Sequence, residues 1–140
     1  MAHDWQLTVD CTDPHRMAAF WAAALGYEVE DHQDLIDRLT ADGVIDPREH
    51  TTLVNGRRAW ITAAAVRDPA DGRRLLFQRV PEPKTVKNRW HVDINAGPER
   101  RDAEAERLVG LGATAVRTVR EPGTHHVLML DVEGNEFCVQ

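Results

Sequence analysis

Hydrophobic positions recur in two spacings along the chain. Apolar residues fall at every second position over residues 5–11, which predicts a strand. They then recur at helical spacing over residues 14–25. Asp13 is placed to cap this helix, Pro14 suits its first position, and Gly26 suits a left-handed end. The segment therefore predicts a strand followed by an amphipathic helix.

The same pattern occurs a second time. Residues 5–29 align with residues 90–116, and in each copy a strand and a helix are followed by a Leu-Gly stop. The second helix is expected from about Pro98 to Gly110. Each copy then ends in strands joined by a turn, and the ends match at Phe77-Gln78 and Phe137-Cys138. The pattern predicts an α+β fold in which a βαβββ unit is used twice.

The duplication sets the expected domain organisation. We expect a single domain over residues 1–140, with a first unit at about 4–82 and a second at about 88–140. The first copy is longer than the second because it carries an insertion at about 34–55.

Two short helices are expected in the insertion. Residues 34–43 have the composition of one helix. A second is expected over residues 46–53, with Asp46 as its cap.

Strand alternation also separates an apolar face from a polar face. The apolar faces are expected to pack on the two helices. Four positions related by the repeat lie on the polar faces and are expected to converge in pairs: Gln6, Gln78, His91 and Cys138. A solvated sheet face is the alternative explanation, since antiparallel sheets often expose one polar face. However, a solvated face rarely selects Gln, His and Cys over Lys, Glu and Thr.

Further candidates lie near these four positions. Glu136 shares the face of Cys138, and one of His125 and His126 must share it too, so Glu136 and His126 are candidate proton-transfer groups. Candidate ligand-contacting residues are Asp10, Gln78, Asp93 and Trp60. Asp10 and Asp93 have an alternative role in salt bridges with Arg79 or Arg89. Trp60 has an alternative role in packing the insertion.

Composition and charge exclude several classes of partner. The chain of 140 residues is 42% hydrophobic and carries a formal net charge of −6, with no basic patch interleaved with aromatics. The longest apolar run, Met17–Leu25, is far too short to span a membrane. The N-terminus has no signal-peptide pattern, and two distant cysteines form no disulfide framework. We expect a cytoplasmic protein that binds neither nucleic acid nor membrane.

Three motifs carry a family resemblance: the Asp-Pro helix that ends in Leu25-Gly26-Tyr27, the His-Val-Asp-Ile strand at 91–94, and the D-x-x-G-N-E-F turn at 131–137. Together with the duplicated unit they resemble the vicinal oxygen chelate superfamily, which includes glyoxalase I, extradiol dioxygenases, fosfomycin-resistance proteins and bleomycin-binding proteins. Residues 77–94 resemble the small glyoxalase-like domain proteins in particular. The resemblance implies a curved, cup-like mixed sheet with helices on the outside.

The resemblance also implies a divalent metal site. Its ligands would come from the first and last strands of each unit, at Gln6, His91 and Cys138, with a further position near Gln78. The family normally has glutamate at the position of Cys138 and commonly at that of Gln78. Without these carboxylates the site holds a hard cation less well, whereas His91 with a Cys138 thiolate favours a softer ion such as zinc.

Two functions follow from the resemblance. One is a metal-dependent lyase or isomerase of the glyoxalase type that acts on a small oxygenated metabolite. The alternative is a metal-free small-molecule binding protein of the bleomycin-resistance type, favoured by the loss of both carboxylates. Whether the protein is an enzyme stays open at this point. A homodimer is expected in either case, because a second chain often completes or braces the cups of related proteins.

Overall fold

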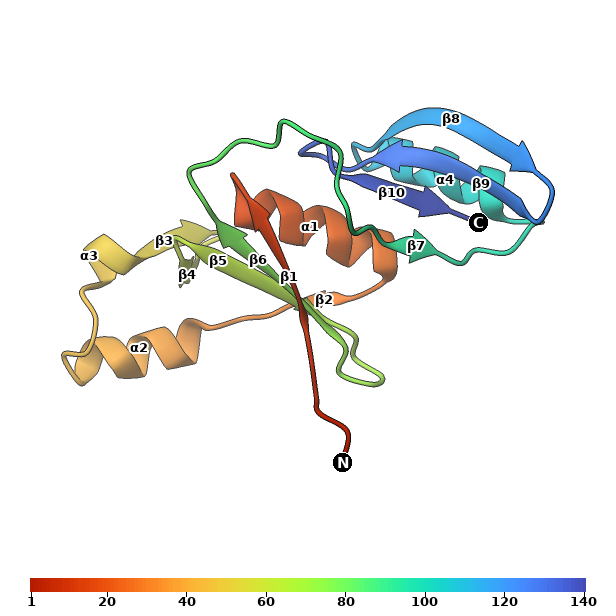
Figure 1. The fold of residues 1–140 in the computed structure, drawn as a ribbon. Helices are drawn as coiled ribbons and strands as arrows, with labels where there is room; N and C mark the ends of the chain where they lie inside the picture. The colour runs from red at the N-terminus through yellow and green to blue at the C-terminus, as the bar shows by residue number, and fades with distance from the viewer.

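The computed structural model describes all 140 residues and contains the βαβββ unit twice (Figure 1). The first unit consists of β1 (Leu7–Cys11), α1 (Pro14–Leu25), β2 (Glu28–Val29), β5 (Ala63–Arg67) and β6 (Arg74–Arg79). The second consists of β7 (Asp93–Ile94), α4 (Arg101–Gly110), β8 (Thr114–Glu121), β9 (Thr124–Leu130) and β10 (Glu136–Val139).

Each unit forms its own four-stranded mixed sheet. The strand order is β1-β6-β5-β2 in the first and β7-β10-β9-β8 in the second, so equivalent strands take equivalent places. In both sheets the first strand pairs in parallel with the last, and the other pairs are antiparallel. Helix α1 packs on β5 and β6, and α4 packs on β8, β9 and β10. The predicted α+β fold of two βαβββ units is confirmed.

The helix boundaries follow from their caps. Asp13 accepts hydrogen bonds from the backbone N–H groups of His15 and Arg16, and Gly26 ends α1 with a left-handed φ of 71°. These features match the sequence expectation. Helix α4 begins at Arg101 rather than near Pro98, and its first position has no side-chain cap.

The insertion contains more than helices. It forms α2 (Gln33–Ala41), α3 (Pro47–His50) and a hairpin of β3 (Thr51–Val54) with β4 (Arg57–Trp60). The expectation of a helix through Leu53 was therefore wrong. The Thr-Thr-Leu-Val run favours a strand, and Asn55-Gly56, with φ of 49° and 78°, forms the tight turn of a hairpin.

Helix α1 joins the two units in one core. The ring of Trp21 lies 5.2 Å from that of Phe137 on β10, and Phe20 lies 6.2 Å from the same ring, both edge to face. Phe77 and Phe137, one from the last strand of each unit, are both almost completely buried. The apolar face of each last strand therefore points toward the helices, as the alternation predicts.

A polar joint reinforces this contact. The buried Asp131 carboxylate accepts a hydrogen bond of 3.1 Å from Trp21 Nε1, and also binds the backbone and side chain of Asn135. The Glu133 carboxylate accepts from the backbone N–H groups of Thr12 and Asp13, at 2.7 and 2.8 Å. The turn before β10 thus fastens the second unit to the start of α1.

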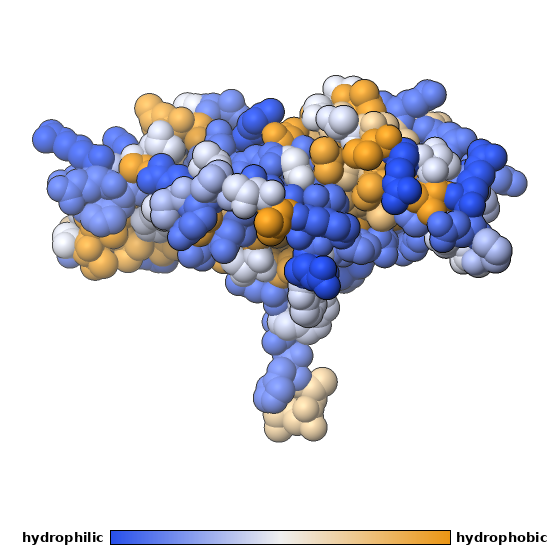
Figure 2. Space-filling model, turned by 45° about the horizontal axis from the view of Figure 1, so that its top comes forward, coloured by the Kyte–Doolittle hydropathy of each residue, from blue (hydrophilic) through white to orange (hydrophobic).

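The face of the molecule drawn in Figure 2 is mostly polar. Figure 2 shows apolar side chains in separate groups among polar ones, and the N-terminal residues extend away from the body. None of the helices has the length and apolar character needed to cross a membrane.

Ionic contacts gather around Glu30 at the β2 side of the first sheet. Glu30, directly after β2, accepts from Arg74 in a bidentate pair at 2.8 Å, from Arg67 at 3.0 Å and from His32 at 3.1 Å. Its side chain is only 15% exposed. Hydrogen bonds from Arg74 outweigh the effect of burial and hold the pKa of Glu30 at about 2.

We expect this network to make stability depend on pH. The folded-state pKa of Glu30 is about 2 and the ordinary value is 4.5, so its stabilisation is present above pH 4.5 and is lost as the pH falls toward 2. Glu30→Gln should lower the free energy of unfolding by about 2 kcal/mol at pH 7, less than the full shift implies because Arg67 is half exposed. Urea unfolding at pH 7 and pH 3 measures the difference, which should shrink at pH 3. Glu28→Gln, at an exposed carboxylate without an ion pair, is the matched control.

Candidate metal centre on β7 and β10

The parallel pairing of β7 with β10 places two candidate ligands side by side. Asp93 and Cys138 are direct neighbours in the register, and Cys138 N donates to Val92 O at 3.0 Å. His91 lies two residues before Asp93, in the segment that leads into β7, and its side chain contacts that of Asp93. Short-range alternation and long-range pairing together bring these three side chains to one place.

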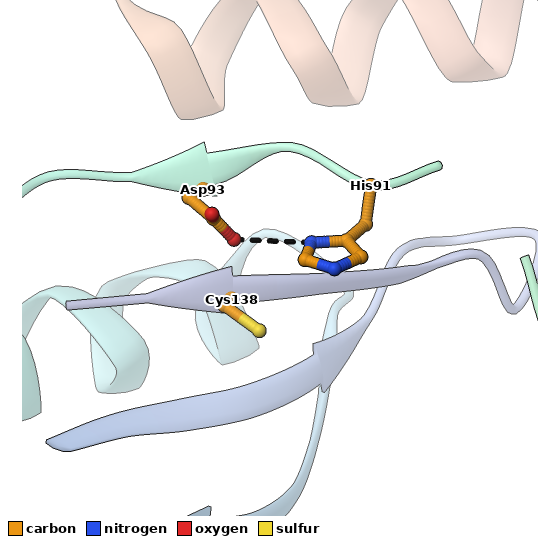
Figure 3. A group of neighbouring side chains, drawn as sticks. All are labelled: His91, Asp93 and Cys138. Carbon is orange, nitrogen blue, oxygen red and sulfur yellow. Dashed lines mark hydrogen bonds and ion pairs between the residues drawn. The ribbon is translucent and has the colours of Figure 1, made fainter. Parts of the chain in front are cut away.

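The three side chains form a compact cluster. One donor atom from each of His91, Asp93 and Cys138 lies within 4.8 Å of the others. Figure 3 shows Asp93 on β7 and His91 on the segment that leads into it, joined by a hydrogen bond of 3.1 Å from His91 Nδ1 to Asp93 Oδ1, with Cys138 on the adjacent strand. The His91 and Asp93 side chains are 40% and 43% exposed, whereas Cys138 is 8% exposed. The cluster is therefore open to solvent on the side of β7.

Local electrostatics keep the thiol protonated when no cation is present. Burial and the charge of Asp93 raise the pKa of Cys138. A divalent cation reverses this preference, because thiolate is the ligand form and a nearby positive charge stabilises it.

The donor set fits a borderline-soft metal. An imidazole nitrogen, a carboxylate oxygen and a thiolate sulfur are the three ligand types of zinc, and three protein ligands with an open position are typical of its catalytic sites. Instead of binding the metal directly, Asp93 can accept the hydrogen bond of His91 Nδ1, which orients the ring and leaves Nε2 free for the metal. The residues present therefore fit zinc better than a hard cation such as magnesium.

Of the four positions expected to converge in pairs, His91 and Cys138 lie together in the cluster, whereas Gln6 and Gln78 lie apart. The side chain of Gln6 accepts a hydrogen bond of 2.6 Å from Arg74, and the register of β1 with β6 places Gln78 beside Asp10. The reason is the strand register, which sequence similarity between the copies does not reveal. A metal role for Gln6 therefore stays a prediction without support from the cluster.

A cavity of about 610 Å³ lies against the cluster. It runs between β1, the segment that links the units, and the turn before β10. Its apolar wall includes Trp21, Phe77 and Phe137. Its polar lining includes Asp10, Lys84, Arg89, His91 and Glu136. His91 is the residue that belongs to both the cavity and the metal-ligand cluster.

Glu136 is held at this cavity in its ionised form. Its carboxylate accepts from Asn88 N at 2.9 Å and from Lys84 Nζ at 3.1 Å. Burial raises the pKa of Glu136, but these donors outweigh burial and the net shift is downward. The side chain is only 15% exposed, so it is a positioned carboxylate rather than a mobile strand-end group.

The other predicted residues lie in different places. His126 shares the face of Leu128 and Leu130 on β9, and its Nδ1 contacts Thr124 Oγ1 at 2.9 Å, but it does not line the cavity. Trp60 lines a second, smaller cavity beside the insertion. The alternative salt bridges of Asp10 and Asp93 with Arg79 or Arg89 are absent. The catalytic and binding roles of these residues remain predictions.

Two contacts at the candidate site were not expected from the sequence. Asp93 was expected to contact a ligand, but it lies in the cluster of groups that could hold a metal, which the His-x-Asp spacing indicates. The pairing of Lys84 and Asn88 with Glu136 joins the unit linker to β10. That contact has no local signal in the sequence, because 48 residues separate Asn88 from Glu136.

Solved structures share this fold. A mutant of FosX from Listeria monocytogenes, complexed with Mn(II) and 1S,2S-dihydroxypropylphosphonic acid, is 13% identical, with a TM-score of 0.64 over 100% of this chain and 90% of its own. A glyoxalase/bleomycin resistance protein/dioxygenase family enzyme from Burkholderia phytofirmans PsJN is 13% identical, with a TM-score of 0.62 over 96% and 94%. The hypothetical protein SA1046 from S. aureus is 12% identical, with a TM-score of 0.63 over 99% and 93%. No curated protein matches the chain in sequence.

The family follows from the sequence as a whole. A family model described as the glyoxalase-like domain matches residues 6–140, which is nearly the full chain. The duplicated βαβββ unit and the structural neighbours agree with that match. The protein is thus a member of the glyoxalase-like domain family, within the vicinal oxygen chelate superfamily.

Proposed function

We propose that the protein is a metal-dependent lyase or isomerase that acts on a small oxygenated metabolite. The observation that carries the proposal is the cluster of His91, Asp93 and Cys138, whose donor atoms lie within 4.8 Å of one another. The position of this cluster at the edge of a cavity of about 610 Å³ adds support, since a catalytic metal contacts its protein ligands and the substrate at the same time.

The residues fall into two groups, those that would bind a metal and those that contact the substrate. His91 and Cys138 would hold the metal, and Asp93 would either bind it or orient His91. The chemistry that a divalent ion would supply here is Lewis-acid polarisation of a substrate oxygen. Glu136 accepts a proton from substrate carbon, because its carboxylate is ionised and lines the cavity together with His91. Arg89 and Lys84 attract an oxygenated or anionic substrate to the same cavity.

A neighbouring fold with a metal lends further support. FosX from Listeria monocytogenes was solved with Mn(II), so this fold accommodates a divalent ion in that protein. The thiol at Cys138 favours zinc over manganese in the present chain, since thiolates select softer ions.

One observation favours the metal-free alternative. The polar groups of the cluster need no cation as a partner, because Asp93 is hydrogen-bonded to His91 and burial raises the pKa of the Cys138 thiol. Gln6 is engaged by Arg74 and adds no fourth donor. In that case the large cavity holds a small molecule without converting it.

We also propose that two chains form a homodimer. Strands β1 and β7 are edge strands, so each leaves one row of backbone groups unpaired. Trp5 and Trp90, at related positions before these strands, are 82% and 84% exposed. A second copy related by a twofold axis would cover both tryptophans with equivalent surfaces, as isologous interfaces require.

Metal binding is the first test. We expect the purified protein to bind about one zinc ion per chain, and His91→Ala and Cys138→Ser each to weaken binding at least about tenfold. Titration against a competing chelator measures the affinity. Cys11→Ser is the matched control, because Cys11 is also buried but lies outside the cluster. Equal zinc affinity in Cys138→Ser and the parent protein would refute the metal centre.

A test for proton abstraction distinguishes the enzyme from the metal-free binding protein. A panel of small 2-hydroxy- and 2-oxo-carbonyl compounds is incubated with the zinc-loaded protein in D₂O. We expect carbon-bound hydrogen of at least one compound to exchange for deuterium, and proton NMR measures the rate of this exchange. Glu136→Gln should slow this exchange about 100-fold or more and leave zinc affinity unchanged. Glu106→Gln, on the outer helix α4, should have no effect. Saturable binding of a panel member without any exchange would instead support the binding protein.

The dimer predicts a solution mass of twice 15.8 kDa by light scattering. Changing both Trp5 and Trp90 to serine should return the mass to that of one chain at the same concentration, because the buried aromatic area is lost. Val44→Ser, at a 66% exposed site in the insertion, should leave the mass unchanged. A single-chain mass for the parent protein would contradict the dimer.

A further inference from the structure

A second cavity lies between the insertion and the outer part of the first sheet. Its volume is about 220 Å³, and none of its lining residues belongs to the larger cavity near His91. The end of β2 and the residues after it, 29–32, form one side, and the β3–β4 hairpin forms the other. Figure 1 shows the insertion on the side of the first sheet away from the second unit. This cavity is therefore separate from the candidate metal centre.

The insertion holds one arginine at the cavity in a fixed position. Arg58 Nη1 donates to Thr51 Oγ1 at 3.0 Å, and Arg58 N donates to Gln33 Oε1 at 2.6 Å. Thr51 is buried, and its hydroxyl donates in turn to Pro47 O. Helix α2, the turn of helix α3 and both hairpin strands thus contribute to the position of a single guanidinium group.

The charges around the cavity leave this guanidinium without a counterion. Of the two acidic residues in the lining, Glu30 is paired with Arg67 and Arg74, and Asp31 is paired with Arg57. Arg58 has no carboxylate partner, and its Nε and Nη2 atoms make no hydrogen bond within the protein. Its side chain is partly buried, but these two nitrogen atoms are not among the buried unsatisfied atoms, so they are accessible to a ligand.

The remaining wall is largely apolar. It is formed by Val29, Val54, Ala59, Trp60, Ala63 and Ala64. The two lining histidines already use Nε2, His15 toward Trp60 O at 2.8 Å and His32 toward Glu30. The volume is below the range of about 300–1,000 Å³ for drug-sized ligands, so a smaller molecule fits.

From this arrangement we propose that the cavity is a binding site for a small monocarboxylate. The carboxylate pairs with the free edge of the Arg58 guanidinium, whose planar N–H groups match two carboxylate oxygens. The apolar body of the ligand lies against Trp60 and the alanines of β5. The site belongs to the insertion, and the proposal does not depend on metal binding or catalysis at His91.

The test uses the full-length protein and four probes: acetate, lactate, pyruvate and benzoate. Titrations followed by ¹H–¹⁵N NMR should show saturable shifts at Arg58, Trp60 and Ala63 for at least one probe, with millimolar affinity or better. Arg58→Met, which keeps the aliphatic length, should weaken that binding at least about tenfold, because the charge-assisted pair is lost. Arg48→Met, an exposed arginine in the same insertion that does not line the cavity, should leave the affinity unchanged.

Neutral and inorganic probes define the chemistry. Benzamide should bind at least about tenfold more weakly than benzoate if the carboxylate is the group recognised. Binding of phosphate or sulfate in preference to all four carboxylates would overturn the assignment. Equal affinity of the protein for benzamide and benzoate, or equal affinity of Arg58→Met and the parent protein for a carboxylate, would also overturn it. So would the absence of any shift at Arg58, Trp60 and Ala63 with every carboxylate. Should Arg58→Met fail to fold by circular dichroism, Arg58→Lys replaces it. Lysine keeps the charge but not the planar fork, so it should weaken binding to a smaller extent.

Discussion

The arrangement of the two units depends on the hydrogen bonds that the buried Asp131 carboxylate accepts. Asp131 is 4% exposed, so its charge must be satisfied within the protein. Its donors come from Trp21 on helix α1 and from the turn that leads into β10. One buried group therefore fixes both the turn geometry and the distance between the first helix and the last strand. The aromatic contact of Trp21 with Phe137 then follows from the same placement.

The position of β10 in turn determines the candidate metal centre. Because β10 pairs with β7 in a fixed register, Cys138 lies beside Asp93 and within reach of His91. The same strand brings Glu136 to Lys84 and Asn88 in the linker between the units. One member of the candidate cluster, Cys138, and the positioned carboxylate of Glu136 thus come from alternate residues of one short strand.

The two units have the same topology but opposite electrostatic character on their polar faces. In the second unit, imidazole, carboxylate and thiol groups gather, which suits a cation. In the first unit, Arg67 and Arg74 both bind Glu30, and Arg74 also binds Gln6, which disfavours a cation at the related position. The insertion adds a further arginine, Arg58, at a separate cavity. Duplication has preserved the backbone arrangement while the charges have diverged.

The sequence by itself determined the duplicated unit, the limits of helix α1 and the inward direction of Phe137 and Val139. Each depends on local spacing and capping, which a chain carries in adjacent residues. The β3–β4 hairpin also had a local signal in Asn55-Gly56. Only the tertiary structure decided that Gln6 meets Arg74 rather than Gln78, that Asp93 joins His91 and Cys138, and that Arg58 is left without a counterion. These outcomes depend on strand register and on contacts between residues distant in sequence, and such pairings are settled by the packing of the whole core rather than by any local pattern.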